Sequence, residues 1–200
     1  NTPEMYECHF GVPMTGAVLN TLNTRLDAEA IAFMLGHGEA KVLITDLEFS
    51  PTIRGALAKL DHQVLVIDVC DSEFDGAGER LGSHEYEEFI SAGASDFAWQ
   101  LPANEWDAIS LNYTSGTTGQ PKGAELRHRN MRDNALAGTQ LFGADPANPD
   151  TYLCVLPLFH SFGQTVIQNG AFAFGGTVVM LPRFEATQAL GLMQREKVTF

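Results

Sequence analysis

The stretch Ile109–Gly123, ISLNYTSGTTGQPKG, joins a short apolar run to a loop rich in glycine and hydroxyl groups. Residues Ile109–Tyr113 are predicted to form a β-strand, and the ten residues that follow hold three Gly, four Ser or Thr, one Pro and one Lys. Glycine adopts positive φ easily, so successive backbone N–H groups in such a loop can converge on an anion. Open α/β sheets bind ligands beyond the carboxyl ends of their strands. The stretch therefore predicts an anion-binding loop at the end of a strand.

The side chains of this loop are suited to phosphate. Thr114, Ser115, Thr117 and Thr118 supply hydroxyl donors, and Lys122 supplies a positive charge. The spacing G-x-x-G-x-x-K-G differs from the G-x-x-x-x-G-K-[ST] of P-loop nucleotidases, so that class is excluded. Composition alone leaves one alternative, a Gly/Ser/Thr hairpin that binds no ligand, because loops of this make-up are common.

Short β-branched runs alternate with amphipathic stretches along the chain, and several runs are apolar on both faces, as in a parallel sheet covered by helices. This alternation predicts an α/β fold with an open, doubly wound, mostly parallel sheet and flanking helices. The expected strands are Lys41–Thr45, Val64–Val69, Ile109–Tyr113, Tyr152–Leu156 and Thr177–Leu181.

Two helix starts are predicted from capping residues. Asp27 is expected to cap a helix that ends at Gly36 or Gly38. Ser50, followed by Pro51, is expected to cap a second helix, because proline is favoured in the first helical turn.

Charge and composition limit the possible partners. The net charge of −13 argues against nucleic acid. Between Lys122 and Arg132 four basic residues face a single acid, Glu125, and this positive region is expected to suit a small anionic ligand. No stretch is apolar enough for a membrane span, and the three distant cysteines favour a reducing cytoplasm over a disulfide framework.

The segment Tyr113–Gly123 resembles the phosphate-loop signature of the adenylate-forming, AMP-binding superfamily. Two further stretches resemble acyl-CoA ligases of this superfamily: Gly11–Leu26 (GVPMTGAVLNTLNTRL) and Leu156–Gly163 (LPLFHSFG). The second corresponds to an aromatic–His element beside the acyl pocket. The resemblance implies that residues 1–200 are part of the large N-terminal domain, truncated at both ends and without the C-terminal lid domain.

The resemblance implies an ATP-dependent acyl-CoA ligase that converts a fatty or related carboxylic acid to an acyl-adenylate and transfers it to coenzyme A. Residues Thr114–Lys122 would bind the β- and γ-phosphates of ATP, Lys122 would provide the counter-charge, and Thr118 would lie nearest to Mg²⁺ held through the phosphates. The loop residues in this assignment are Thr114, Ser115, Gly116, Thr117, Thr118, Gly119, Gln120, Pro121 and Lys122.

His160 has two interpretations. It lies in the acyl pocket near the substrate carboxylate if the resemblance holds, whereas a single histidine is more often packed between a strand and a helix. The motif around it favours the pocket. Two alternative functions stay open, a nucleotide-binding module without catalysis and an amino-acid-adenylating domain. Because later motifs of the superfamily are absent, we expect the isolated 200-residue chain to be inactive, and its oligomeric state is not predicted.

Overall fold

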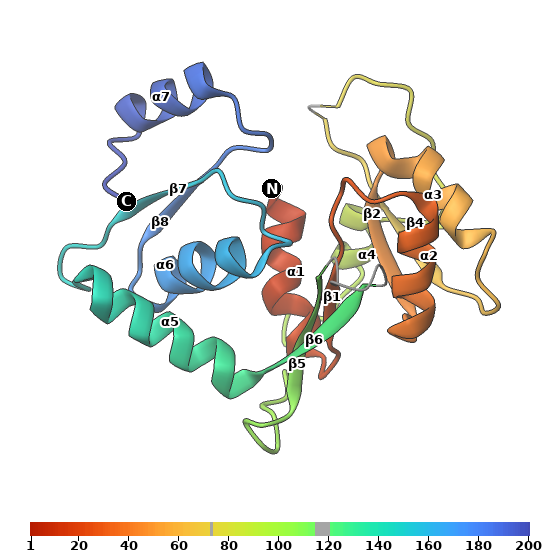
Figure 1. Ribbon diagram of the computed structural model, residues 1–200, viewed down its shortest axis with the longest axis horizontal. Helices are drawn as coiled ribbons and strands as arrows, with labels where there is room; N and C mark the ends of the chain where they lie inside the picture. Colours follow the sequence, from red (N-terminus) through yellow and green to blue (C-terminus); the bar gives the residue numbers. More distant parts are fainter. Residues whose placement is uncertain (73, 115–120) are drawn as a thin grey trace. The chain divides into compact units, whose positions relative to one another are not determined.

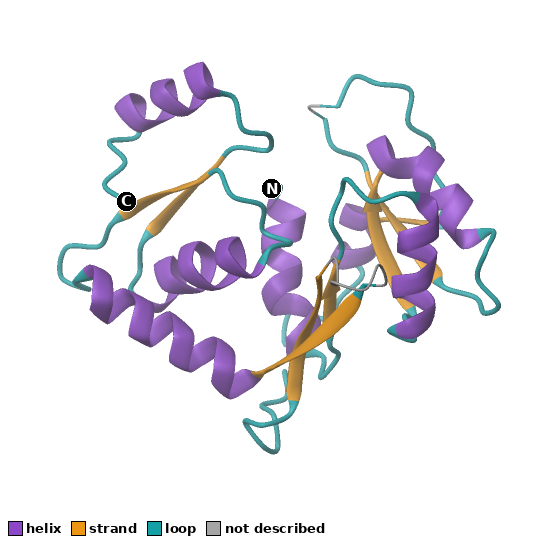
Figure 2. Ribbon diagram, in the orientation of Figure 1, coloured by secondary structure: helices purple, strands orange, loops and turns teal. Residues whose placement is uncertain are grey.

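A computed structural model describes residues 1–72, 74–114 and 121–200 of the chain. The predicted fold class is confirmed: helices flank small sheets, and the strand pairs β1–β5, β2–β3, β3–β4 and β7–β8 are all parallel (Figures 1 and 2). The chain divides into two compact units. One comprises Asn1–Thr21, Gln100–Asn112 and Ala124–Phe200, and the other comprises Leu22–Trp99 and Tyr113–Gly123.

The Leu22–Trp99 unit is built on a three-stranded parallel sheet of order β2-β3-β4. Its core joins Leu43 of the first strand to Ile31, Leu35 and Ile53 of the helices α2 and α3. The elements of this unit are α2 (Ala28–His37), β2 (Val42–Asp46), the 3₁₀ helix η1 (Leu47–Phe49), α3 (Ser50–Leu57), β3 (Leu65–Val69), β4 (His84–Glu85) and α4 (Tyr86–Ser91).

The two capping predictions had different outcomes. Asp27 caps α2 through a hydrogen bond from the Ala30 N–H to its carboxylate, and the helix ends at Gly38 as expected. The prediction for Ser50 was wrong, because Phe49 is in the cap position, Ser50 is the first residue of α3, and the Ser50 hydroxyl accepts a hydrogen bond from the backbone N–H of Glu79. The Ser50 hydroxyl, which could otherwise cap the helix, is used in a hydrogen bond to a residue distant in sequence.

The unit that contains both ends of the chain holds two sheets. In one the strand order is β1-β5-β6, and in the other β7 pairs with β8. Helices α5, η2 and α6 pack on one another, and η2 contacts β7. Its core includes Tyr152, Cys154, Leu158 and Ile167. The elements are α1 (Pro3–Met14), β1 (Leu19–Thr21), β5 (Ala108–Thr114), β6 (Lys122–Arg127), α5 (His128–Phe142), β7 (Thr151–Cys154), the π-helix η2 (Gly163–Asn169), α6 (Gly170–Ala173), β8 (Thr177–Met180) and α7 (Ala186–Arg195).

Asp68 and Gly82 close the loop between β3 and β4. The Asp68 carboxylate is 1% exposed and accepts hydrogen bonds from the N–H groups of Leu81 and Gly82, at 3.1 and 2.9 Å. This brings Gly82 so close to β3 that a Cβ there would overlap the carbonyl group of Val66. The loop can therefore return to the sheet only with glycine at this position.

We expect Gly82→Ala to lower the free energy of unfolding by about 1–3 kcal/mol, because the added methyl group must displace β3 backbone. Gly36→Ala is the matched control: its Cβ would lie 3.9 Å from the nearest atom, on Leu60, and alanine favours the helix by about 0.5–1 kcal/mol. Urea unfolding followed by circular dichroism measures both variants. A Gly82→Ala midpoint at or above the Gly36→Ala midpoint would contradict the close approach.

Candidate functional site

Strand β5 leads directly into the predicted phosphate loop. Thr114 is the exposed last residue of β5, and Lys122 is the exposed first residue of β6, with Pro121 half-buried before it. The predicted phosphate-binding residues Ser115, Gly116, Thr117, Thr118, Gly119 and Gln120 lie outside the described residues.

Tyr113 anchors the start of the loop to helix α2. Its phenol oxygen lies 2.8 Å from Nδ1 of His37 and 3.5 Å from the backbone carbonyl of Met34. Phe33 and His37 stack on each other, and the ring of Tyr113 meets both rings edge-on. Burial raises the pKa of Tyr113, so the phenol is a neutral hydrogen-bonding group in this contact. The residue before the loop is thus held by an aromatic cluster of its own unit.

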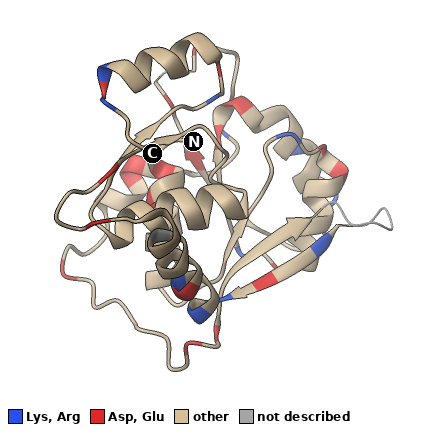
Figure 3. Cartoon of the chain, turned by 60° about the vertical axis from the view of Figure 1, so that its left-hand side comes forward, with Lys and Arg blue, Asp and Glu red and all other residues tan. Residues whose placement is uncertain are grey.

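Lys122 differs from the basic residues that follow it. Arg127 pairs with Glu125 at 2.8 Å, Arg129 pairs with Asp133 at 3.3 Å, and Arg132 pairs with both Asp133 and Glu105. Figure 3 shows basic and acidic residues alternating along β6 and the first turns of α5.

The positive region predicted from the sequence is therefore largely neutralised by neighbouring carboxylates. Besides Glu125, the negative charge comes from Asp133, next to Arg132 in sequence, and from Glu105, which is distant in sequence. Among the described residues, no carboxylate lies within ion-pair distance of Lys122, which leaves its ammonium group available to an anionic ligand.

His160 lies at the end of a tight turn before η2. Its backbone N–H donates to the carbonyl of Pro157 at 3.0 Å, and its carbonyl accepts from the N–H of Gln164 at 3.0 Å. A Cβ at Gly163 would overlap the Pro157 carbonyl, so glycine is required where η2 begins. π-Helical turns are often found at functional sites.

The His160 ring is exposed, so the interpretation as a histidine packed between strand and helix is wrong. Its Nδ1 accepts a hydrogen bond from the backbone N–H of Phe162 at 3.2 Å. A backbone N–H can only donate, so the proton of the neutral ring lies on Nε2. The exposed Nε2–H is a donor suited to an anionic oxygen.

The buried histidine of this unit is His9, which the sequence did not single out. Its Nδ1 lies 2.7 Å from the Met5 carbonyl, and its Nε2 lies 3.1 Å from the Leu158 carbonyl. Desolvation lowers the pKa of His9, although the two carbonyl contacts act in the opposite direction. Its nearness to the His160 turn depends on tertiary contacts, and no local pattern around residue 9 indicates it.

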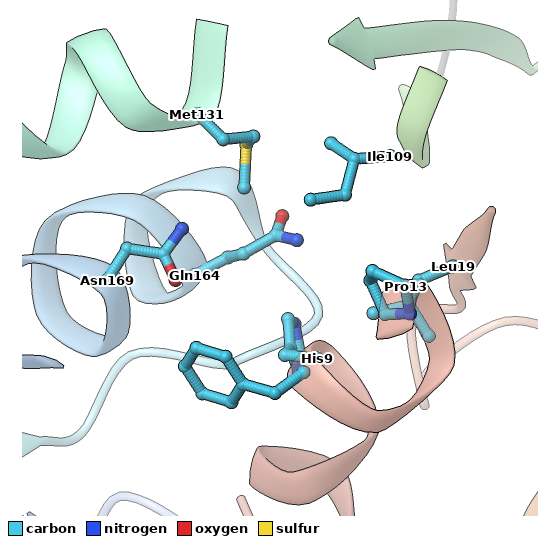
Figure 4. A pocket seen from close by; sticks show the side chains of 8 residues that line it. His9, Pro13, Leu19, Ile109, Met131, Gln164 and Asn169 are labelled. Atoms are coloured by element: carbon cyan, nitrogen blue, oxygen red, sulfur yellow. The ribbon is translucent and has the colours of Figure 1, made fainter. Parts of the chain in front are cut away.

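A small cavity of about 80 Å³ lies beside Gln164 (Figure 4). The Gln164 amide points between Ile109 and Met131 on one side and His9 on the other. Cavities that bind nucleotides or drug-sized ligands usually exceed about 300 Å³, so this space is suited to a few water molecules only.

In residues 1–72, 74–114 and 121–200, no three His, Cys, Asp or Glu side chains gather as a metal site would require. None of the described helices combines the length and the apolar character needed to cross a membrane.

Comparison with known proteins places these features in a family. Residues 1–200 match the model of the family described as "AMP-binding enzyme". The chain is 37% identical to acetate/butyrate–CoA ligase AAE7, peroxisomal, of Arabidopsis thaliana, and 38% identical to 2-methylpropanoate–CoA ligase CCL4 of Humulus lupulus. Each match covers the whole chain but only 36% of the relative's length.

Solved structures of similar fold support the same family assignment. A putative long-chain-fatty-acid CoA ligase from Rhodopseudomonas palustris matches the whole chain with a TM-score of 0.81 at 27% identity, over 47% of its own length. ATP-bound MatB from the same organism matches 98% of the chain with a TM-score of 0.79 at 26% identity, over 36% of its length. O-succinylbenzoate coenzyme A synthetase from Bacillus subtilis, in complex with ATP and magnesium, matches the whole chain with a TM-score of 0.76 at 25% identity, over 36% of its length.

The signature after β5, the Phe159-His160 turn before η2 and the match over all 200 residues lead to one assignment: the chain belongs to the family of AMP-binding enzymes.

Proposed function

We propose that the chain is part of an ATP-dependent acid–thiol ligase, which activates a carboxylic acid as an acyl-adenylate and transfers the acyl group to coenzyme A. The observation that supports this most strongly is the family match over residues 1–200, together with relatives that are named CoA ligases. In this proposal residues 1–200 are a partial N-terminal AMP-binding domain, and a C-terminal lid domain lies elsewhere in the complete protein.

The loop after β5 performs the electrostatic part of the first step. A carboxylate is a poor electrophile, so the enzyme directs it to the α-phosphate of ATP and releases pyrophosphate. Charge builds up on the departing pyrophosphate, and backbone N–H groups, hydroxyls and the Lys122 ammonium stabilise it. Lys122 is exposed and has no carboxylate partner among the described residues, which fits this role.

In this proposal Mg²⁺ would bind at the same site mainly through the phosphates of the nucleotide. The loop offers hydroxyl oxygens and no carboxylate, and Mg²⁺ in such sites commonly binds substrate phosphates and water with few protein ligands. When bound, it would neutralise phosphate charge, with Thr118 as the proposed nearest hydroxyl. The synthetase that was solved with ATP and magnesium is consistent with this arrangement.

His160 orients the acid substrate in this proposal. The Phe162 N–H occupies its Nδ1, so the exposed Nε2–H is the donor that faces a carboxylate oxygen. This single neutral donor aligns the carboxylate without cancelling the negative charge that makes it a nucleophile.

The substrate we propose is a small aliphatic acid. The relatives that are 37–38% identical carry acetate, butyrate and 2-methylpropanoate in their names, whereas one structural neighbour is named for long-chain fatty acids at 27% identity. Location in the cytoplasm also stays a proposal, and the peroxisome is its alternative because one relative is named peroxisomal.

Acid-dependent exchange of labelled pyrophosphate into ATP tests the function in the complete protein. We expect exchange with butyrate and acetate, and formation of acyl-CoA once coenzyme A is added. Exchange with amino acids alone would favour an amino-acid-adenylating domain. ATP binding without exchange for any acid would favour a binding module. The isolated 200-residue chain should give no exchange.

We expect Lys122→Ala to slow butyrate-dependent pyrophosphate exchange by about 100- to 1,000-fold, the usual loss when one such donor is removed. Lys41→Ala removes an exposed lysine of the same unit and should retain wild-type exchange. Exchange rates and ATP affinity unchanged in Lys122→Ala would refute the phosphate role.

For His160→Ala we expect kcat/KM for butyrate to fall by at least about tenfold, because the acid loses its orienting donor, while KM for ATP stays within about twofold. His84→Ala removes another exposed histidine and serves as the control. An effect confined to KM for ATP would contradict the proposed contact with the acid.

A further inference from the structure

The peptide group between Phe159 and His160 is held from both sides. Its carbonyl, that of Phe159, accepts hydrogen bonds from the Thr21 hydroxyl at 3.0 Å and from the Asn112 amide at 3.5 Å. Its N–H, that of His160, donates to the Pro157 carbonyl at 3.0 Å. Fixing both ends of a planar peptide group fixes its orientation, and therefore the direction in which the His160 side chain leaves the backbone.

The groups that hold this carbonyl belong to a closed network of buried neutral side chains. Asn112 donates to the Thr21 hydroxyl at 3.2 Å and to the Gln164 amide oxygen at 3.3 Å, and it accepts from Ser110 at 2.7 Å. Gln164 in turn donates to Ser110 at 3.4 Å. The four side chains are between 1% and 9% exposed. Each hydroxyl donates once and accepts once, whereas the two amide hydrogens of Asn112 are shared among three acceptors, of which the Phe159 carbonyl is the most distant.

The two peptide groups on either side of the Leu158 Cα have separate anchors. The Leu158 carbonyl lies 3.1 Å from Nε2 of His9, and the Leu158 N–H donates to the Asn1 side chain at 2.8 Å. Two consecutive residues before His160 are thus fixed by side chains from distant parts of the chain.

We propose that Thr21 and Asn112 are positioning residues for His160. They act together with Ser110 and Gln164 as a clamp, and this clamp sets the angle at which the His160 Nε2–H meets the substrate carboxylate. The inference rests on the proposed function. Asn112 also lies two residues before Thr114, so the strand that leads into the phosphate loop is the one that fixes the histidine turn.

A matched set of threonine variants of the complete protein tests the clamp. Thr21→Val keeps the shape of the side chain but removes the hydroxyl, whereas Thr21→Ser keeps the hydroxyl. Thr15→Val is the control, because it removes an exposed hydroxyl that donates to the Val12 carbonyl at 2.7 Å, outside the clamp.

We expect Thr21→Val to lower kcat/KM for butyrate by about 10- to 100-fold, since small displacements of a positioning group cost that much. KM for ATP should stay within about twofold, Thr21→Ser should restore most of the loss, and Thr15→Val should match the wild type. Equal activity in Thr21→Val and Thr21→Ser would overturn the proposal.

A double variant separates positioning from general loss of structure. If Thr21 acts through His160, then Thr21→Val in a His160→Ala background should cause no further loss of kcat/KM. If the two losses multiply, Thr21 acts independently of the histidine and the proposal fails.

Hydrogen exchange gives a readout that does not depend on activity. The amides of His160 and Gln164 should exchange faster in Thr21→Val than in the wild type, and Thr21→Ser should restore their protection. Unchanged protection would refute the clamp. A wild-type protein that is inert toward every acid would refute the proposed function and the catalytic role of the clamp. An active wild type with an unaffected Thr21→Val would refute the clamp alone.

Discussion

The amide of Asn112 is the group on which the proposed site depends most. A buried amide that loses its partners costs about 1–3 kcal/mol, so its hydrogen-bonding groups must find protein or water. Here they find Ser110 on the same strand, Thr21 on β1 and Gln164 on η2. These partners can be reached together only when β1 lies in register beside β5 and η2 begins against that sheet. Satisfying one side chain therefore defines the arrangement of three elements that are far apart in sequence.

Whether a residue's partners are near or far in sequence explains which features could be predicted from the sequence. The strands and the α2 cap are local, because a β-branched run or an Asp before an apolar helix decides them within a few residues. Ser50 satisfied the local rule for a cap equally well. Its hydroxyl nevertheless bonds the Glu79 N–H, a partner that no rule based on neighbouring residues would include.

In the candidate site, too, features set by neighbouring residues differ from features set by contacts between distant parts of the chain. The loop after β5 and the Phe159-His160 element are predicted from their residues alone, because short motifs carry the resemblance. The clamp was missed, although Ser110 and Asn112 give a weak signal as polar residues at alternate positions of an otherwise apolar strand. Strand register and the position of η2 decide whether such residues face solvent or a buried network. The steric requirement at Gly163 depends on how the turn from Pro157 folds, because a Cβ at Gly163 would overlap the Pro157 carbonyl.

Positioning and charge are supplied by different kinds of residue in this chain. Ser110, Asn112, Thr21 and Gln164 carry no ionisable group, and burial favours the neutral form of His9, so the groups that hold the His160 turn keep their charge state near neutral pH. Within the described part of the chain, the arginines after the loop pair with carboxylates and Lys122 does not, so the Lys122 charge is available to a ligand on a strongly acidic chain. In the proposed function the Lys122 charge attracts the polyphosphate, whereas neutral hydrogen bonds within the other unit fix the His160 turn. Changes in salt would then alter nucleotide attraction far more than the orientation of the histidine, because screening weakens exposed charges and leaves buried dipoles nearly unaffected.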